Sequence, residues 1–94
     1  MVVKKSTKPD KKLMAIFTDE KGKTTTTHFG NRGSDDYLKS KDKELRKRYR
    51  ARHAVDLRTK DSTRAGYLSY YILWGDSTSL DKNVEDYKKR FGYK

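Results

Sequence analysis

The sequence contains no cysteine and only two histidines among its 94 residues. Without cysteine the chain can form neither disulfide bonds nor the thiolate sites that hold structural zinc. The two histidines, His28 and His53, show no recognisable metal-ligand spacing to a carboxylate. We therefore expect no metal, no cofactor and no catalytic residues, and the sequence predicts a protein that is not an enzyme.

One set of residues suggests a catalytic alternative. His28, Asn31 and His53 carry the side chains found in His-Asn-His nucleases. That site needs a compact unit of two strands and one helix around a metal ion, whereas a long basic stretch separates Asn31 from His53. The structural interpretation is favoured, in which His53 lies on a helix surface or packs against neighbouring side chains.

Long hydrophobic runs are also absent. No run approaches the roughly 20 apolar residues needed to span a bilayer, so we expect no membrane insertion. The first five residues lack the apolar stretch of a secretory signal, which favours an intracellular protein. Hydrophobic residues make up only 32% of the chain, but seven Tyr, three Phe and one Trp supply enough bulky surface for one small folded domain.

Positive charge is what the sequence has in excess. Lys and Arg number 24 against 13 Asp and Glu, which gives a net charge of +11. Residues 1–12 carry five Lys and one Asp, and residues 39–60 carry ten basic and three acidic residues, while the rest is almost neutral. A localised excess of this size attracts extended anionic partners.

The first of these segments predicts a flexible basic arm over residues 1–12, followed by a single compact domain over residues 13–94. The arm contains the only proline and almost nothing apolar. Within the domain, residues 13–17 and 24–29 are apolar or β-branched and flank a Gly-containing turn, which predicts a β-hairpin.

Helical patterns follow the hairpin. Apolar spacing and capping residues predict helices over about residues 40–55, 63–74 and 79–91. The second is apolar or aromatic nearly all round, so we expect it at the centre of the core. The predicted fold class is therefore α+β, an N-terminal hairpin packed on three helices.

A helical wheel divides the first of these helices into two faces. One arc holds Leu45, Tyr49, Ala51 and Val55, and it is expected to pack inward. Lys43, Arg46, Lys47 and Arg50 lie roughly opposite and are expected to be exposed. Arg48 and Arg52 fall inside the apolar arc, where they are expected to lie along it or to pair with an acid such as Asp56.

Several short motifs in these segments are shared with a known group. They are residues 28–30 (HFG), 41–44 (KDKE), 48–53 (RYRARH), 66–69 (GYLS) and 72–74 (ILW). With them the chain resembles a family of small basic proteins of unknown function encoded by large DNA viruses of protists and algae. The resemblance covers roughly residues 13–92. It implies a viral setting, with genome packaging or a virion role in an infected cell, and it carries over no binding residues.

The basic helix is the candidate site. A charge run usually forms a solvated face. Here, however, ten cations with few acidic neighbours repel one another, and this repulsion lowers stability. A face that is merely solvated does not require such a loss. We therefore favour binding of a polyanion, most simply of nucleic acid, with DNA favoured over RNA. The residues expected to contact phosphate are Lys43, Arg46, Lys47, Arg50, Arg58 and Lys60, joined by Lys4, Lys5, Lys8, Lys11 and Lys12 of the arm and by Arg32.

Binding is expected to tolerate any nucleotide sequence. The basic helix contains no Gln or Asn, the amide side chains that read adenine in the major groove, although Arg could still read guanine. Tyr67, Tyr70, Tyr71 and Trp74 could stack on bases, but the small core needs them more. The alternative function is a structural or adaptor protein whose basic face binds an acidic viral or host protein. The oligomeric state is open.

Overall fold

The computed structural model describes residues 1–94 and begins with a three-stranded antiparallel sheet. The strands are β1 (Val2–Lys5), β2 (Lys11–Thr18) and β3 (Thr24–Asn31), in the order β1-β2-β3. The β2–β3 pair is the predicted hairpin. Its turn is held by the Asp19 carboxylate, which accepts hydrogen bonds from the backbone N–H groups of Lys21 and Lys23, both at 2.9 Å.

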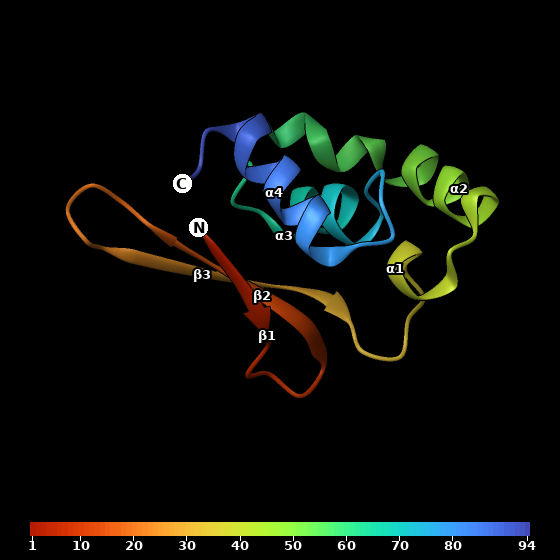
Figure 1. The fold of residues 1–94 in the computed structure, drawn as a ribbon, viewed down its shortest axis with the longest axis horizontal. Coiled ribbons are helices and arrows are strands. Elements are labelled where there is room, and N and C mark those ends of the chain that lie inside the picture. Colours follow the sequence, from red (N-terminus) through yellow and green to blue (C-terminus); the bar gives the residue numbers. More distant parts are fainter.

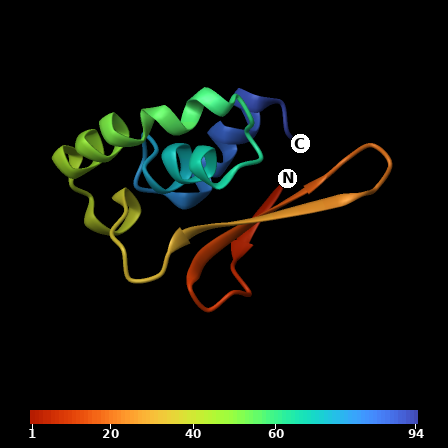
Figure 2. The same ribbon diagram turned by 180° about the vertical axis from the view of Figure 1, so that it is seen from behind.

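The helices lie on one side of this sheet, as both views of the ribbon show (Figures 1 and 2), and α3 and η2 contact β3. The arrangement is an α+β fold, which confirms the predicted class. The helical elements are α1 (Tyr37–Ser40), α2 (Lys43–His53), the 3-10 helix η1 (Ala54–Thr59), α3 (Ala65–Leu68), the π-helical turn η2 (Ser69–Leu73) and α4 (Leu80–Phe91).

The three predicted helices correspond to α2 with η1, α3 with η2, and α4. α2 starts later than predicted because Asp42, and not Ser40, is its N-cap. α4 begins after its Ser79 cap, as the sequence indicates, and ends at Gly92, whose φ of 73° suits a residue without a Cβ atom. α1 was not predicted. It is a single turn capped by the buried Asp36 carboxylate.

The flexible arm predicted over residues 1–12 contains a strand. Val2–Lys5 forms strand β1, in which Val3 pairs with Ala15 of β2. An exposed edge of β2 would leave a row of backbone N–H and C=O groups without partners, and β1 satisfies them. The lysine-rich composition does not oppose this, because Lys4 and Lys5 stay exposed while Val3 packs against the core.

The core lies between the sheet and the helix formed by α3 and η2. Leu68 and Ile72 of this helix are completely buried, and Phe29 of β3 and Tyr87 of α4 belong to the same cluster. Tyr67 and Trp74 are buried and Tyr70 and Tyr71 half-buried, which confirms the prediction that these aromatic rings pack. The central position expected for this helix is confirmed as well.

Asn83 of α4 fixes the connection between η2 and α4. The residue is 2% exposed, and its side-chain amide donates to the carbonyl oxygens of Ile72 (2.9 Å) and Ser77 (2.7 Å) and accepts from the Ser77 N–H (3.1 Å). Gly75 lies against it, and a Cβ atom there would sit 2.2 Å from the Tyr71 carbonyl oxygen. Only glycine fits at this position.

Candidate functional site

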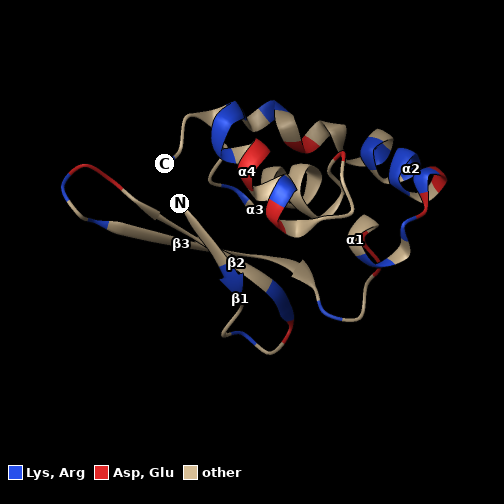
Figure 3. Cartoon of the chain, in the orientation of Figure 1, with Lys and Arg blue, Asp and Glu red and all other residues tan.

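Seven lysine and arginine side chains between residues 41 and 60 are exposed and form no salt bridge. Lysine and arginine residues recur along α2 (Figure 3). The acids of the same segment are few: Asp42 and Glu44 lie at the start of α2, and Asp56 pairs with His53. We call this set the α2 cation surface: Lys41, Lys43, Lys47, Arg48, Arg52, Arg58 and Lys60.

The local sequence explains why this charged segment is helical. The Asp42 carboxylate accepts hydrogen bonds from the N–H groups of Glu44 (3.0 Å) and Leu45 (3.1 Å), which satisfies two of the unpaired donors of the first turn. Arg50 and Arg52 occupy the last turn, where positive charge suits the negative end of the helix dipole. Both ends therefore favour the helix.

The predicted exposure of Arg46 and Arg50 is wrong. Their side chains are only 23% exposed and both bind the Asp76 carboxylate, Arg50 at 3.1 Å. Arg46 also donates to the Gly75 carbonyl oxygen at 2.7 Å and lies over the ring of Tyr37. These two arginines therefore join α2 to the segment that follows η2.

Arg50 has a second aromatic partner. Its guanidinium carbon lies 4.5 Å from the ring centroid of Tyr70. Partial burial acts to lower the pKa of Arg50, but the contacts with Tyr70 and Asp76 outweigh it and raise that pKa above its usual value. The side chain is a fixed structural cation.

The packed face of α2 is accordingly rotated by about 100° from the predicted one, close to one residue step of a helical wheel. Leu45 and Tyr49 pack inward as predicted, but Ala51 is exposed and Val55 is 52% exposed. Arg48 and Arg52, expected along the apolar arc, are exposed instead. Ala51 and Val55 are small, so packing them inward would give less contact than Arg46 and Arg50 make with Tyr37, Tyr70 and Asp76.

Replacing Arg46 by alanine is expected to lower the free energy of unfolding by about 1–2 kcal/mol, since the hydrogen bond to Gly75 and the packing on Tyr37 are lost. Lys47→Ala is the matched control, because this neighbour is exposed and unpaired, and its effect should stay within about 0.5 kcal/mol. Urea denaturation of both variants measures the difference. Equal losses would contradict the assignment of Arg46 to the fold.

The remaining predicted contact residues fall into two groups. Most are exposed, and these are Lys4, Lys5, Lys8, Arg32, Arg58 and Lys60. Lys11 and Lys12 are half-buried at the start of β2. Lys12 forms a salt bridge with Asp36 at 2.6 Å, so its charge is balanced, whereas Lys11 donates only to the neutral Asn31 side chain at 2.8 Å.

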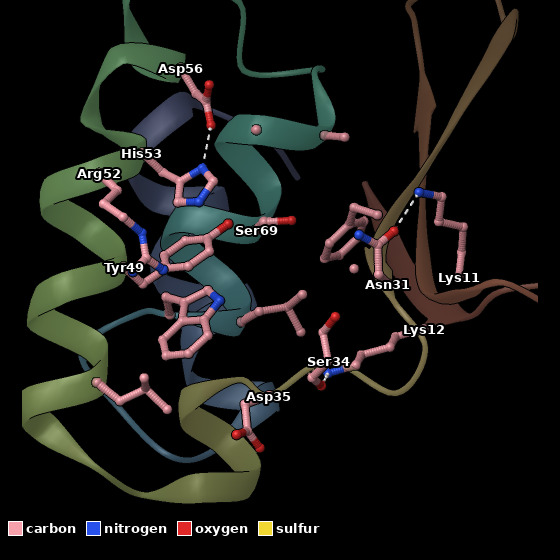
Figure 4. A pocket seen from close by; sticks show the side chains of 17 residues that line it. Lys11, Lys12, Asn31, Ser34, Asp35, Tyr49, Arg52, His53, Asp56 and Ser69 are labelled. Atoms are coloured by element: carbon pink, nitrogen blue, oxygen red, sulfur yellow. Dashed lines mark hydrogen bonds and ion pairs between the residues drawn. The ribbon is translucent and has the colours of Figure 1, made fainter.

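A cleft of about 500 Å³ separates the ends of β2 and β3 from the helices. Figure 4 shows the sheet residues facing the helical ones across it. The cleft was not predicted, because its walls come from segments far apart in the chain. The polar residues that line it are Lys11, Lys12, Asn31, Ser34 and Asp35 on one side and Arg52, His53, Asp56 and Ser69 on the other.

Three stacked rings form part of the helical wall. Tyr49 lies between His53 and Trp74, with ring centroids 4.1 Å and 4.4 Å away and interplanar angles of 21° and 11°. Burial, and then the charge of Asp56, raise the pKa of the Tyr49 hydroxyl, which is therefore uncharged near neutral pH. The only signal in the sequence was the spacing of four between Tyr49 and His53, which brings two side chains together on a helix.

The histidines have separate structural roles. Ser6 Oγ lies 2.7 Å from Nδ1 of His28, and Nδ1 of His53 lies 3.1 Å from the Asp56 carboxylate. No group of three or more His, Asp or Glu side chains is arranged to hold a metal ion. Separately, none of the helices combines the length and apolar character that crossing a bilayer requires.

Comparison with known proteins identifies the class of this chain. A model of a family of unknown function, DUF5754, matches residues 1–53. This is more than half of the chain, and the chain therefore belongs to that family. The matched part contains the whole sheet, α1 and α2. No curated protein and no solved structure matches the chain.

Proposed function

We propose that the protein binds nucleic acid without reading its sequence, through the α2 cation surface. The observation that carries the proposal is the set of seven exposed cations without a carboxylate partner between residues 41 and 60. Unpaired cations on one segment repel each other, and an anionic partner reduces this repulsion. Phosphate backbones supply regularly spaced negative charge and release counterions when such a surface binds.

The residues of this interface differ from those predicted from the sequence. Lys43, Lys47, Arg58 and Lys60 stay in it, and Lys41, Arg48 and Arg52 join it. Arg46 and Arg50 contribute by holding α2 in place. Lys4, Lys5, Lys8 and Arg32 add exposed charge from the sheet side of the molecule.

The proposed setting follows from the resemblance to proteins of large DNA viruses. The nucleic acid is then the viral genome, and DNA is preferred to RNA as the ligand. The protein acts inside an infected cell, during packaging or as a component of the virion. It has no catalytic role in this proposal.

A competition experiment tests the proposal against an adaptor role. The protein is bound to a labelled DNA duplex and challenged with unlabelled duplexes of unrelated sequence, with duplex RNA and with polyglutamate. We expect the unrelated DNA duplexes to compete about equally, because phosphate contacts carry no sequence information. If polyglutamate displaces the labelled duplex at a concentration of negative charge at which unlabelled DNA does not, the result would contradict nucleic-acid binding and favour an acidic protein partner.

A further inference from the structure

The cleft beside the α2 cation surface has the features of a binding site for a single base. Its volume of about 500 Å³ lies within the range of about 300–1,000 Å³ typical of small-molecule sites. Apolar side chains such as Phe29 and Leu73 line it together with hydrogen-bonding groups. The mixture suits a flat heterocycle with polar edges.

Trp74 supplies an unused hydrogen-bond donor in this cleft. The residue is 5% exposed and lines the cavity, and its indole N–H donates to no acceptor in the protein. No fully buried side-chain nitrogen or oxygen is left without a partner, so the indole nitrogen is not sealed from solvent, and the cleft is the cavity that Trp74 lines. A donor held in this way, on a ring fixed by stacking against Tyr49, is ready for an acceptor from outside.

The stack also leaves aromatic surface accessible. His53 is its outer ring, and the His53 side chain is 40% exposed. Bases of any identity stack on such rings, because every base has a π face. The nearby Asp56 carboxylate and Ser69 hydroxyl can hydrogen-bond to polar groups on the edge of a base.

Cations stand on both sides of the cleft. Arg52 on the helical side is exposed and has no carboxylate partner, and Lys11 on the sheet side donates to the neutral Asn31 side chain and likewise forms no salt bridge. Arg52 also belongs to the α2 cation surface. A strand that lies on this surface therefore reaches the cleft at Arg52, although the carboxylates of Asp35 and Asp56 also line the cavity.

We propose that the cleft receives one unstacked base of a single-stranded nucleic acid, whose flanking phosphates are held by Arg52 and Lys11. The proposal rests on the proposed function and deepens it, since it names single strands as the preferred form. A base-paired strand keeps its bases stacked inside the duplex and cannot fill the cleft. The α2 cation surface then supplies general affinity, and the cleft supplies the preference for exposed bases.

Trp74 is the only tryptophan of the chain, so its fluorescence reports directly on the cleft. The unmodified protein is titrated with three labelled probes of equal length: a thymidine single strand, an abasic strand with the same phosphates, and a duplex. Affinity is measured by anisotropy and the cleft by Trp74 emission. We expect the thymidine strand to bind about tenfold more tightly than the abasic strand and to change the emission, which the abasic strand leaves unchanged.

Equal affinity for the two strands with unchanged emission would overturn the base site and leave the proposed function standing. Absence of binding by all three probes would overturn both proposals.

Arg52→Gln should reduce the emission change and the preference for bases. Arg48→Gln removes the same charge from the α2 cation surface at a position that does not line the cleft, so it should lower the affinity for all three probes alike and keep both the emission change and the preference for bases. Equal loss of the preference in the two variants would also count against the site.

Discussion

The double variant Lys43→Glu/Lys47→Glu is expected to bind DNA about 100-fold more weakly than the unmodified protein at physiological salt, since two phosphate contacts are replaced by repulsion. Both side chains are exposed and unpaired, so the fold should be unaffected. A glutamate at residue 43, in the first turn of α2, even suits the helix dipole. Fluorescence anisotropy with a labelled duplex measures the affinity, and thermal melting checks the fold.

The matched control is Lys21→Glu/Lys23→Glu in the β2–β3 turn. Both double variants reduce the net charge from +11 to +7, because each replaces two positive charges by two negative ones. Charges more than a Debye length of about 8 Å away are largely screened at physiological salt, so the control should lose only a few-fold in affinity. Equal losses in the two double variants would show that overall charge, and not the α2 cation surface, controls binding.

The largest expected loss of stability comes from Tyr87→Ala. Tyr87 is 1% exposed, its hydroxyl donates to the Ser62 carbonyl oxygen, and its ring lies 4.6 Å from that of Phe91. Removing the ring should lower the free energy of unfolding by about 3–5 kcal/mol, a large part of the roughly 5–15 kcal/mol of a typical domain.

Tyr87→Phe separates the ring from its hydroxyl. It keeps the packing and loses only the hydrogen bond to Ser62, which should cost about 1 kcal/mol. Burial raises the pKa of Tyr87, so the hydroxyl remains a protonated donor over the whole pH range in which the protein is handled. Chemical denaturation of both variants gives the comparison. Similar losses for alanine and phenylalanine would contradict the central position of the ring.

Local patterns account for the parts of the fold that the sequence predicts. The stripe of Leu80, Val84, Tyr87 and Phe91 has helical spacing, and its caps at Ser79 and Gly92 act within a few residues. The β2–β3 hairpin likewise depends on a turn held by its own Asp19. In such segments the residues that decide the structure are neighbours in the chain.

Contacts between distant segments account for what the sequence does not predict. Arg46 and Arg50 turn inward because Asp76, some 30 residues away, meets them both. β1 forms because β2 offers an open edge, although the composition of residues 1–12 is typical of a flexible segment. The cleft needs β2, β3, α2 and α3 in their final positions, so no single stretch of sequence indicates it.

The salt dependence of DNA binding tests the central claim most directly. The affinity of the unmodified protein for a duplex is measured over a series of salt concentrations, and log K is plotted against log salt. If about six cations of the α2 cation surface and its surroundings contact phosphates, the slope should be near −5, since each contact contributes about −0.9. A slope near zero, or no binding even at low salt, would contradict nucleic-acid binding by this surface.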